Sequence, residues 1–191
     1  MNVLICGVGG QGILLSSDLL AQAALNQGYD VKKAEVHGMA QRGGSVVSHI
    51  RFSNKVYSPL IPEGRADFIL SFEEMETLRY INFLSPKGMV IFDKFRFPSL
   101  SVLAKEAEYP ADIEERIKRI TRNYSILPAY KIATELGNPR VQNVIFLGAL
   151  SNFLDISYDN WKKAMRRLIK PQYLKLNLKA FRKGRETYKG Y

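Results

Sequence analysis

Cysteine is almost absent from this sequence. The 191 residues include one cysteine, Cys6, which excludes a disulfide framework, a cysteine-ligated zinc site and iron–sulfur ligation by this chain alone. The sequence also lacks an apolar run as long as a membrane span, and its N-terminus has neither a basic region nor a small-residue cleavage site. These absences predict a cytoplasmic protein without a membrane partner, whose redox chemistry would depend on a borrowed cofactor.

Acidic residues are scarce relative to basic ones. Lys and Arg total 28 against 18 Asp and Glu, a formal charge of +10 that favours an acidic partner, an anionic cofactor or nucleic acid. Much of the excess lies on helical patterns between Lys162 and Lys189, where a solvated helix face is the simpler interpretation. Because no helix-turn-helix, zinc-finger or RRM signature accompanies the charge, we do not expect nucleic-acid binding.

The first 27 residues contain the pattern around which the rest of the chain is organised. Val3–Cys6 is uniformly apolar, as in a strand buried on both faces, and Ile13–Gln27 has helical spacing before a terminating Gly28. The turn between them matches G-x-G-x-x-G and provides five candidate cofactor-binding residues: Gly7, Gly9, Gly10, Gln11 and Gly12. Such a turn lets the backbone approach an anion at a helix N-terminus; alternatively, the glycines only allow the helix to pack closely on the strand.

A second segment bounded by glycines follows a predicted strand over residues 30–36. Its further candidates for binding are Glu35, Arg42, Gly43 and Gly44, with His37 as a candidate general base. Glu35 lies 23 positions after Gly12, near the place where a dinucleotide-binding fold puts the acid that holds a ribose. Arg42 is suited to a phosphate or carboxylate, and equally to an ion pair with Glu35. The spacing fits neither a hydrolase triad nor a metal motif, and a hydrogen-bonding role is the alternative for His37.

The remaining pattern predicts a single domain over residues 1–191. Strands are expected at 45–52, 67–72, 89–92 and 126–130, and helices at 73–84, 131–136, 141–153, 159–169 and 172–188, with charged helical stretches within 99–122. Strand 45–52 alternates and is expected to add to the sheet in antiparallel orientation. The fold class is therefore α/β and Rossmann-like, a mostly parallel sheet with helices on both faces and a helical C-terminal segment. Both glycine segments would meet at its ligand-binding edge, beyond the carboxyl ends of the strands.

Several segments resemble one known family. They are GVGGQGILLSS, EVHGMAQRGGSVVSHIR, YSPLIPEGRADFILSFEEMETLR, GNPRVQNVIFLGAL and NLKAFRKG. Together they are similar to the gamma-type subunits of 2-oxoacid:ferredoxin oxidoreductases, and HGMAQRGG is the most specific of them. The chain most resembles the indolepyruvate ferredoxin oxidoreductase branch, in which the gamma-type domain is a separate small chain, the beta subunit.

The resemblance implies a role as a subunit in the oxidative decarboxylation of an arylpyruvate such as indolepyruvate, with coenzyme A as co-substrate. Thiamine diphosphate and [4Fe-4S] clusters would belong to a larger partner subunit, and ferredoxin would take electrons from the complex. The two glycine segments would lie toward the partner's active site, and the chain would be inactive alone, although an isolated chain could form a homodimer. A second hypothesis is an independent oxidoreductase that binds NAD or FAD through the glycine turn and Glu35.

Overall fold

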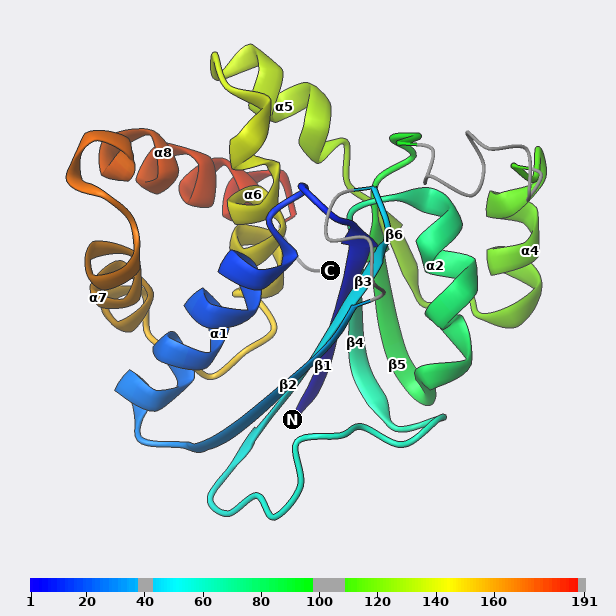
Figure 1. Cartoon of the computed structure of the whole chain (residues 1–191), viewed down its shortest axis with the longest axis horizontal. Helices are drawn as coiled ribbons and strands as arrows, with labels where there is room; N and C mark the ends of the chain where they lie inside the picture. The colour runs from blue at the N-terminus through cyan, green and yellow to red at the C-terminus, as the bar shows by residue number, and fades with distance from the viewer. Residues whose placement is uncertain (38–42, 98–108, 189–191) are drawn as a thin grey trace.

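A six-stranded mixed sheet lies at the centre of the molecule (Figure 1). The computed structural model describes residues 1–37, 43–97 and 109–188, and the strand order is β2-β3-β1-β4-β5-β6. The strands are β1 (Asn2–Val8), β2 (Asp30–His37), β3 (Ser45–Ser53), β4 (Ala66–Ser71), β5 (Leu84–Phe92) and β6 (Tyr124–Ile126). β1, β4, β5 and β6 run parallel, whereas β3 is antiparallel to both of its neighbours. The mostly parallel sheet and the antiparallel orientation of strand 45–52 are confirmed.

Helices cover both faces of this sheet, as predicted. They are α1 (Ile13–Gln27), α2 (Glu74–Tyr80), α4 (Ile113–Ile120), α5 (Ala129–Glu135), α6 (Gln142–Leu150), α7 (Tyr158–Leu168) and α8 (Pro171–Thr187), with short 3-10 turns at Ile81–Phe83 and Pro139–Val141. Helices α2 and α4 lie on one side of the sheet, and α1, α6, α7 and α8 lie on the other (Figure 1).

Two predicted strands, 126–130 and 89–92, differ from the structure by several residues. The strand expected at 126–130 ends at Ile126, because helix α5 begins at Ala129, directly after Pro128. Strand β5 begins at Leu84, before the predicted start at residue 89, and includes the Pro86–Gly88 segment. Of the charged stretch 99–122, the structure describes α4 and the residues around it, while 98–108 lies outside the described residues.

The side chains of β1 divide the core into two layers. Val3 and Ile5 pack in the cluster that contains α1, α6, α7 and α8, whereas Leu4 and Cys6 pack in the cluster beneath α2 and α4. All four side chains are fully buried. The apolar run at the start of the sequence therefore follows from a central strand that is covered on both faces.

Helices α6 and α8 approach each other at two glycines. A Cβ atom on Gly148 would lie 2.1 Å from the carbonyl oxygen of Phe181, and one on Gly184 would lie 2.0 Å from that of Ile145. Both distances are shorter than any side chain allows, so only glycine permits this crossing. The crossing fixes α8 against α6, a helix whose residues are all buried and whose first turn contacts the glycine turn.

Candidate functional site

The two glycine segments meet at the carboxyl edge of the sheet. The Gly9 amide donates a hydrogen bond to the Gly44 carbonyl at 2.8 Å, and the Gly43 amide donates to the Gly9 carbonyl at 3.2 Å. In the antiparallel ladder, Val46 lies opposite Gly7. The predicted meeting of both segments at one edge is confirmed, and it depends on the place of β3 beside β1.

The turn between β1 and α1 borders a hollow. Gly10 and Gly12 have φ angles of 108° and 83°, in the left-handed region that favours glycine. Gly12 begins α1, and no side chain among the described residues caps that helix end. A hollow of about 460 Å³ adjoins it, lined by the glycines of the turn together with Ile13, Leu14, Leu15 and Val46. Unsatisfied helix-start amides beside an apolar wall suit an elongated ligand that carries an anionic group.

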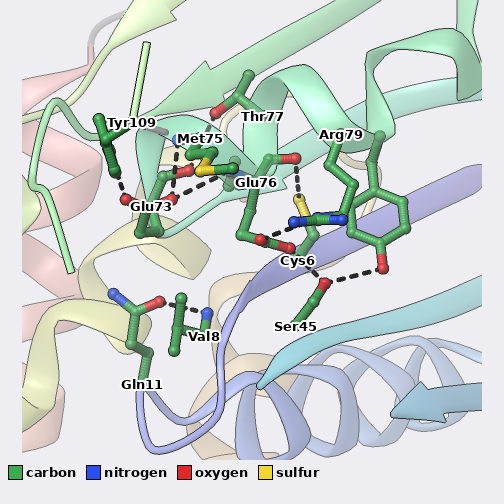
Figure 2. A network of polar contacts seen from close by, with 12 residues as sticks. Cys6, Val8, Gln11, Ser45, Glu73, Met75, Glu76, Thr77, Arg79 and Tyr109 are labelled. Atoms are coloured by element: carbon green, nitrogen blue, oxygen red, sulfur yellow. Dashed lines mark hydrogen bonds and ion pairs between the residues drawn. The ribbon is translucent and has the colours of Figure 1, made fainter. Parts of the chain in front are cut away.

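Gln11, a predicted binding residue, holds two strands together. Its side-chain Oε1 accepts from the Val8 amide at 2.8 Å, and its Nε2 donates to the Phe72 carbonyl at 2.9 Å. Figure 2 shows the Gln11 amide turned toward Val8. Only 7% of the residue is exposed. The Gln11 side chain therefore links the carboxyl ends of β1 and β4 behind the turn.

Asn143 supports the glycine turn from helix α6. Its Nδ2 donates to the Gly12 carbonyl at 3.3 Å, and its Oδ1 accepts from the Val144 amide at 2.8 Å. A Cβ atom on Gly12 would lie 2.6 Å from the same Nδ2. Sequence reasoning did not identify Asn143, although two polar residues, Gln142 and Asn143, directly before the apolar run 144–150 are a signal that could have done so.

Glu35 is already paired within the protein. Its Oε1 lies 2.6 Å from Nζ of Lys33 and accepts from the Ser17 hydroxyl at 3.4 Å. Strand β3 lies between β1 and β2, so Glu35 is not on a strand adjacent to β1. The acid that holds a ribose in a dinucleotide-binding fold belongs on such a strand, and the structure therefore removes the main argument for nicotinamide binding.

Two further predicted residues of this segment are His37, which the structure describes in part, and Arg42, which it does not describe. His37 is the last residue of β2, and its backbone lies opposite Val46, on the same level of the sheet as Gly7. With strands about 4.8 Å apart, two strand spacings separate the two backbones by roughly 10 Å. Arg42 lies outside the described residues, and so does the side chain of His37.

A buried polar network fixes the start of β3 on the other face of the sheet (Figure 2). Glu76, which is 1% exposed, accepts from the Ser45 hydroxyl and from Nε of Arg79 at 3.0 Å. The Ser45 hydroxyl also lies 3.0 Å from the Tyr80 hydroxyl. Because Ser45 follows Gly44 directly, the network fixes the position at which Gly44 leads into β3. Sequence reasoning did not find this link between α2 and the loop.

The single cysteine belongs to the same buried region. The Cys6 thiol donates to the Glu76 carbonyl at 3.8 Å, and burial raises the pKa of this thiol far above its usual range. A thiol that stays protonated is a poor nucleophile and a poor metal ligand. Cys6 is therefore a core residue.

Glu73 is the N-cap of helix α2, at the residue where the sequence predicts that a helix begins. Its Oε2 accepts from the amides of Met75 at 2.8 Å and Glu76 at 3.0 Å. Its Oε1 accepts from the Tyr109 hydroxyl and from the Phe97 amide. Burial raises the pKa of Glu73, although these donors act in the opposite direction. The carboxylate is fully used in structure and does not form an acid–base pair.

The described part of the chain contains neither a candidate metal site nor a candidate membrane span. No group of three His, Cys, Asp or Glu residues there could hold a metal ion. No helix within residues 1–37, 43–97 and 109–188 is long and apolar enough to cross a membrane.

Comparison with known proteins gives one consistent result. The family model described as pyruvate ferredoxin/flavodoxin oxidoreductase matches residues 2–187. Indolepyruvate oxidoreductase subunit IorB of Pyrococcus horikoshii is 43% identical over 190 residues, which cover 96% of this chain and 93% of that protein. The subunit of the same name from Thermococcus kodakarensis is 41% identical, with the same coverage of both chains.

Solved structures share the fold. The gamma subunit of a keto/oxoacid ferredoxin oxidoreductase from Geobacter sulfurreducens superimposes with a TM-score of 0.73 at 23% identity, covering 98% of this chain and 97% of that chain. Pyruvate oxidoreductase subunit PORC from Thermotoga maritima gives a TM-score of 0.72 at 20% identity, covering 97% and 95%. At these identities, the likeness supports the mixed sheet and its helices.

Proposed function

The chain belongs to the pyruvate ferredoxin/flavodoxin oxidoreductase family, and from this membership we propose that it is the small subunit of an indolepyruvate:ferredoxin oxidoreductase. The observation that carries the proposal is the 43% identity to an indolepyruvate oxidoreductase subunit over 96% of this chain. The complex would oxidatively decarboxylate an arylpyruvate and transfer the acyl group to coenzyme A. This chain would contribute one gamma-type domain over residues 1–191.

The catalytic cofactors would belong to a larger partner subunit. Thiamine diphosphate and iron–sulfur clusters would be held there, ferredoxin would accept the electrons, and the complex would be cytoplasmic. The composition of this chain supports that division, because one buried cysteine cannot ligate a cluster. The engagement of Glu35, Glu73 and Glu76 in internal hydrogen bonds also supports it, and we expect the isolated chain to be inactive.

The glycine turn would hold part of coenzyme A. Coenzyme A supplies the thiol that accepts the acyl group. The amides at the start of α1 would bind an anionic group of this molecule, and the apolar wall of Ile13, Leu14 and Val46 would exclude water from its uncharged part. Gly43 and Gly44 would shape the hollow from the second segment. Arg42 would pair with a phosphate or carboxylate, and His37 would remain the candidate general base.

An independent NAD- or FAD-binding enzyme is not favoured. Glu35 is paired with Lys33, and β3 separates its strand from β1. Calorimetric titration of the isolated chain with NAD and FAD is expected to give no heat at millimolar ligand.

Anaerobic purification of the tagged chain from its native cells tests the proposed function. We expect a larger subunit with thiamine diphosphate and iron–sulfur clusters to co-purify. The complex should reduce ferredoxin in a reaction that requires an arylpyruvate and coenzyme A. Removal of this chain should abolish the activity, and its return should restore it. Recovery of the chain alone, or activity that survives its removal, would overturn the proposal.

A further inference from the structure

Three large apolar side chains are exposed beside the glycine turn. Leu14 is 44% exposed, Leu168 38% and Tyr173 49%, and they come from the starts of α1 and α8 and the end of α7. Leu14 lines the hollow at the turn, and the other two line a second hollow of about 380 Å³. Leu15 lines both hollows, so the two hollows adjoin at this residue.

Cations accompany these apolar side chains. Arg140 and Lys170 line the second hollow, and neither forms an ion pair with another residue of the described ranges. Among the residues that the structure describes, no acidic one lines that hollow. We call the five residues Leu14, Arg140, Leu168, Lys170 and Tyr173 the docking surface.

The wider surroundings of the docking surface carry nearly all of the net charge. Residues 158–191, which include α7 and α8, contain 11 Lys and Arg against two acids, Asp159 and Glu186. Residues 1–157 are almost balanced, with 17 Lys and Arg against 16 Asp and Glu. A helix face that contacts only water does not require such an excess of basic over acidic residues. The charge is concentrated on the two helices that lead into the docking surface.

We propose that the docking surface binds the larger catalytic subunit, through a patch of that subunit in which apolar side chains are surrounded by carboxylates. Exposed leucines and a tyrosine flanked by cations have the composition of a protein interface, with an apolar centre and a charged rim. A nucleic-acid surface would present phosphates and would leave the leucines without partners.

The position of the docking surface identifies the partner. The inference depends on the proposed function, in which the glycine turn faces an active site on the larger subunit. A chain that covers the turn must contact Leu14. Because the two hollows adjoin at Leu15, we expect the same chain to reach Leu168 and Tyr173 as well. The glycine turn and the docking surface would therefore be covered together.

Two variants test the proposal in the reconstituted complex. Tyr173→Ala removes an exposed anchor, and Lys170→Glu reverses a rim charge. Their matched controls are Tyr57→Ala, at a tyrosine that is 89% exposed, and Lys87→Glu, at an exposed lysine at the opposite end of the strands. Each variant is first compared with the unmodified chain by thermal melting. The affinity of each for the larger subunit is then measured anaerobically at low and high salt.

We expect Tyr173→Ala to weaken binding of the larger subunit at least about tenfold, as for a central interface tyrosine. Lys170→Glu should weaken it at low salt and less at high salt, because salt screens a rim charge. Both controls should bind as the unmodified chain does. The inference would be overturned if both test variants assembled normally with the larger subunit. It would also be overturned if they assembled normally but raised the KM for ferredoxin, or if the docking surface gave the chain a salt-dependent affinity for DNA. If the unmodified chain bound no such subunit, the proposed function itself would fail.

Discussion

Replacement of Gln11 by alanine separates a structural role of this residue from a ligand-binding one. The change leaves the Val8 amide and the Phe72 carbonyl without their partner, and both belong to buried residues. Each unpaired buried group costs about 1–3 kcal/mol, so the free energy of unfolding should fall by at least about 2 kcal/mol. For a chain of this length, such a loss lowers Tm by about 4–8 °C.

The assay is thermal unfolding of the isolated chain, followed by coenzyme A-dependent activity after reconstitution. Gln11→Glu keeps the acceptor for Val8 but faces the Phe72 carbonyl with a second acceptor, so it should also be destabilised. Gln22→Ala is the matched control. Gln22 lies in α1, the helix that follows the turn, and within the described residues its half-buried side chain bonds only to Asn26. The Tm of Gln22→Ala should therefore change little. A Gln11→Ala variant that melts normally and yet loses activity would refute the structural role.

Three further predictions concern the helix crossing, a buried histidine and the glycine turn. Gly184→Ala should lower the free energy of unfolding by about 1–3 kcal/mol, because the added methyl group meets the backbone of α6. Lys183→Ala, on the exposed side of α8, should leave it unchanged. Urea unfolding compares the two variants. Burial lowers the pKa of His49, whose Nδ1 accepts from the Ile61 amide at 3.2 Å. The imidazole of His49 therefore binds a proton more tightly in the unfolded chain than in the folded one. The stability that neutral His49 contributes is complete above about pH 6.5 and is lost as the pH falls through the lowered pKa of the folded chain. Urea unfolding between pH 5 and 7.5 should show that slope, and His49→Gln should reduce it; equal slopes would contradict the assignment. Gly10→Ala should lower the free energy of unfolding by about 1–2 kcal/mol, because alanine is strained at the φ of 108° that Gly10 adopts. It should also raise the KM of the complex for coenzyme A. An unchanged KM would mean that coenzyme A binds elsewhere.

Local patterns in the sequence predicted the frame of the fold. The apolar run of β1 indicates a central strand, and the alternation in 45–52 indicates a strand of a different kind, which proved antiparallel. The start of β5 was predicted too late, because the feature that places Pro86–Gly88 in the strand is not local. A Cβ atom on Gly88 would lie 2.5 Å from the Ala66 carbonyl, so this glycine allows close approach to β4 beside an irregularity in the ladder.

The supporting residues of the site could not be predicted for the same reason. Asn143 and Gly12 are 131 positions apart, and Ser45 and Glu76 are 31 apart. No period or motif relates such positions. The glycine turn has a local signature and was found, but its supports depend on which helices fold back over the sheet.

The antiparallel place of β3 also affects the order in which the site assembles during folding. β2 and β3 form a hairpin of eight registered pairs, whereas the parallel pairing of β1 with β4 joins Val3 to Phe68, 65 positions away. Loop closure costs more entropy as sequence separation grows, and hairpins form within microseconds. We therefore expect the hairpin to form before the parallel half of the sheet. The candidate site would then form only when β1 pairs with β3 of that hairpin. The rate at which β1 pairs would therefore set the rate at which the folding chain becomes able to bind a ligand at the glycine turn.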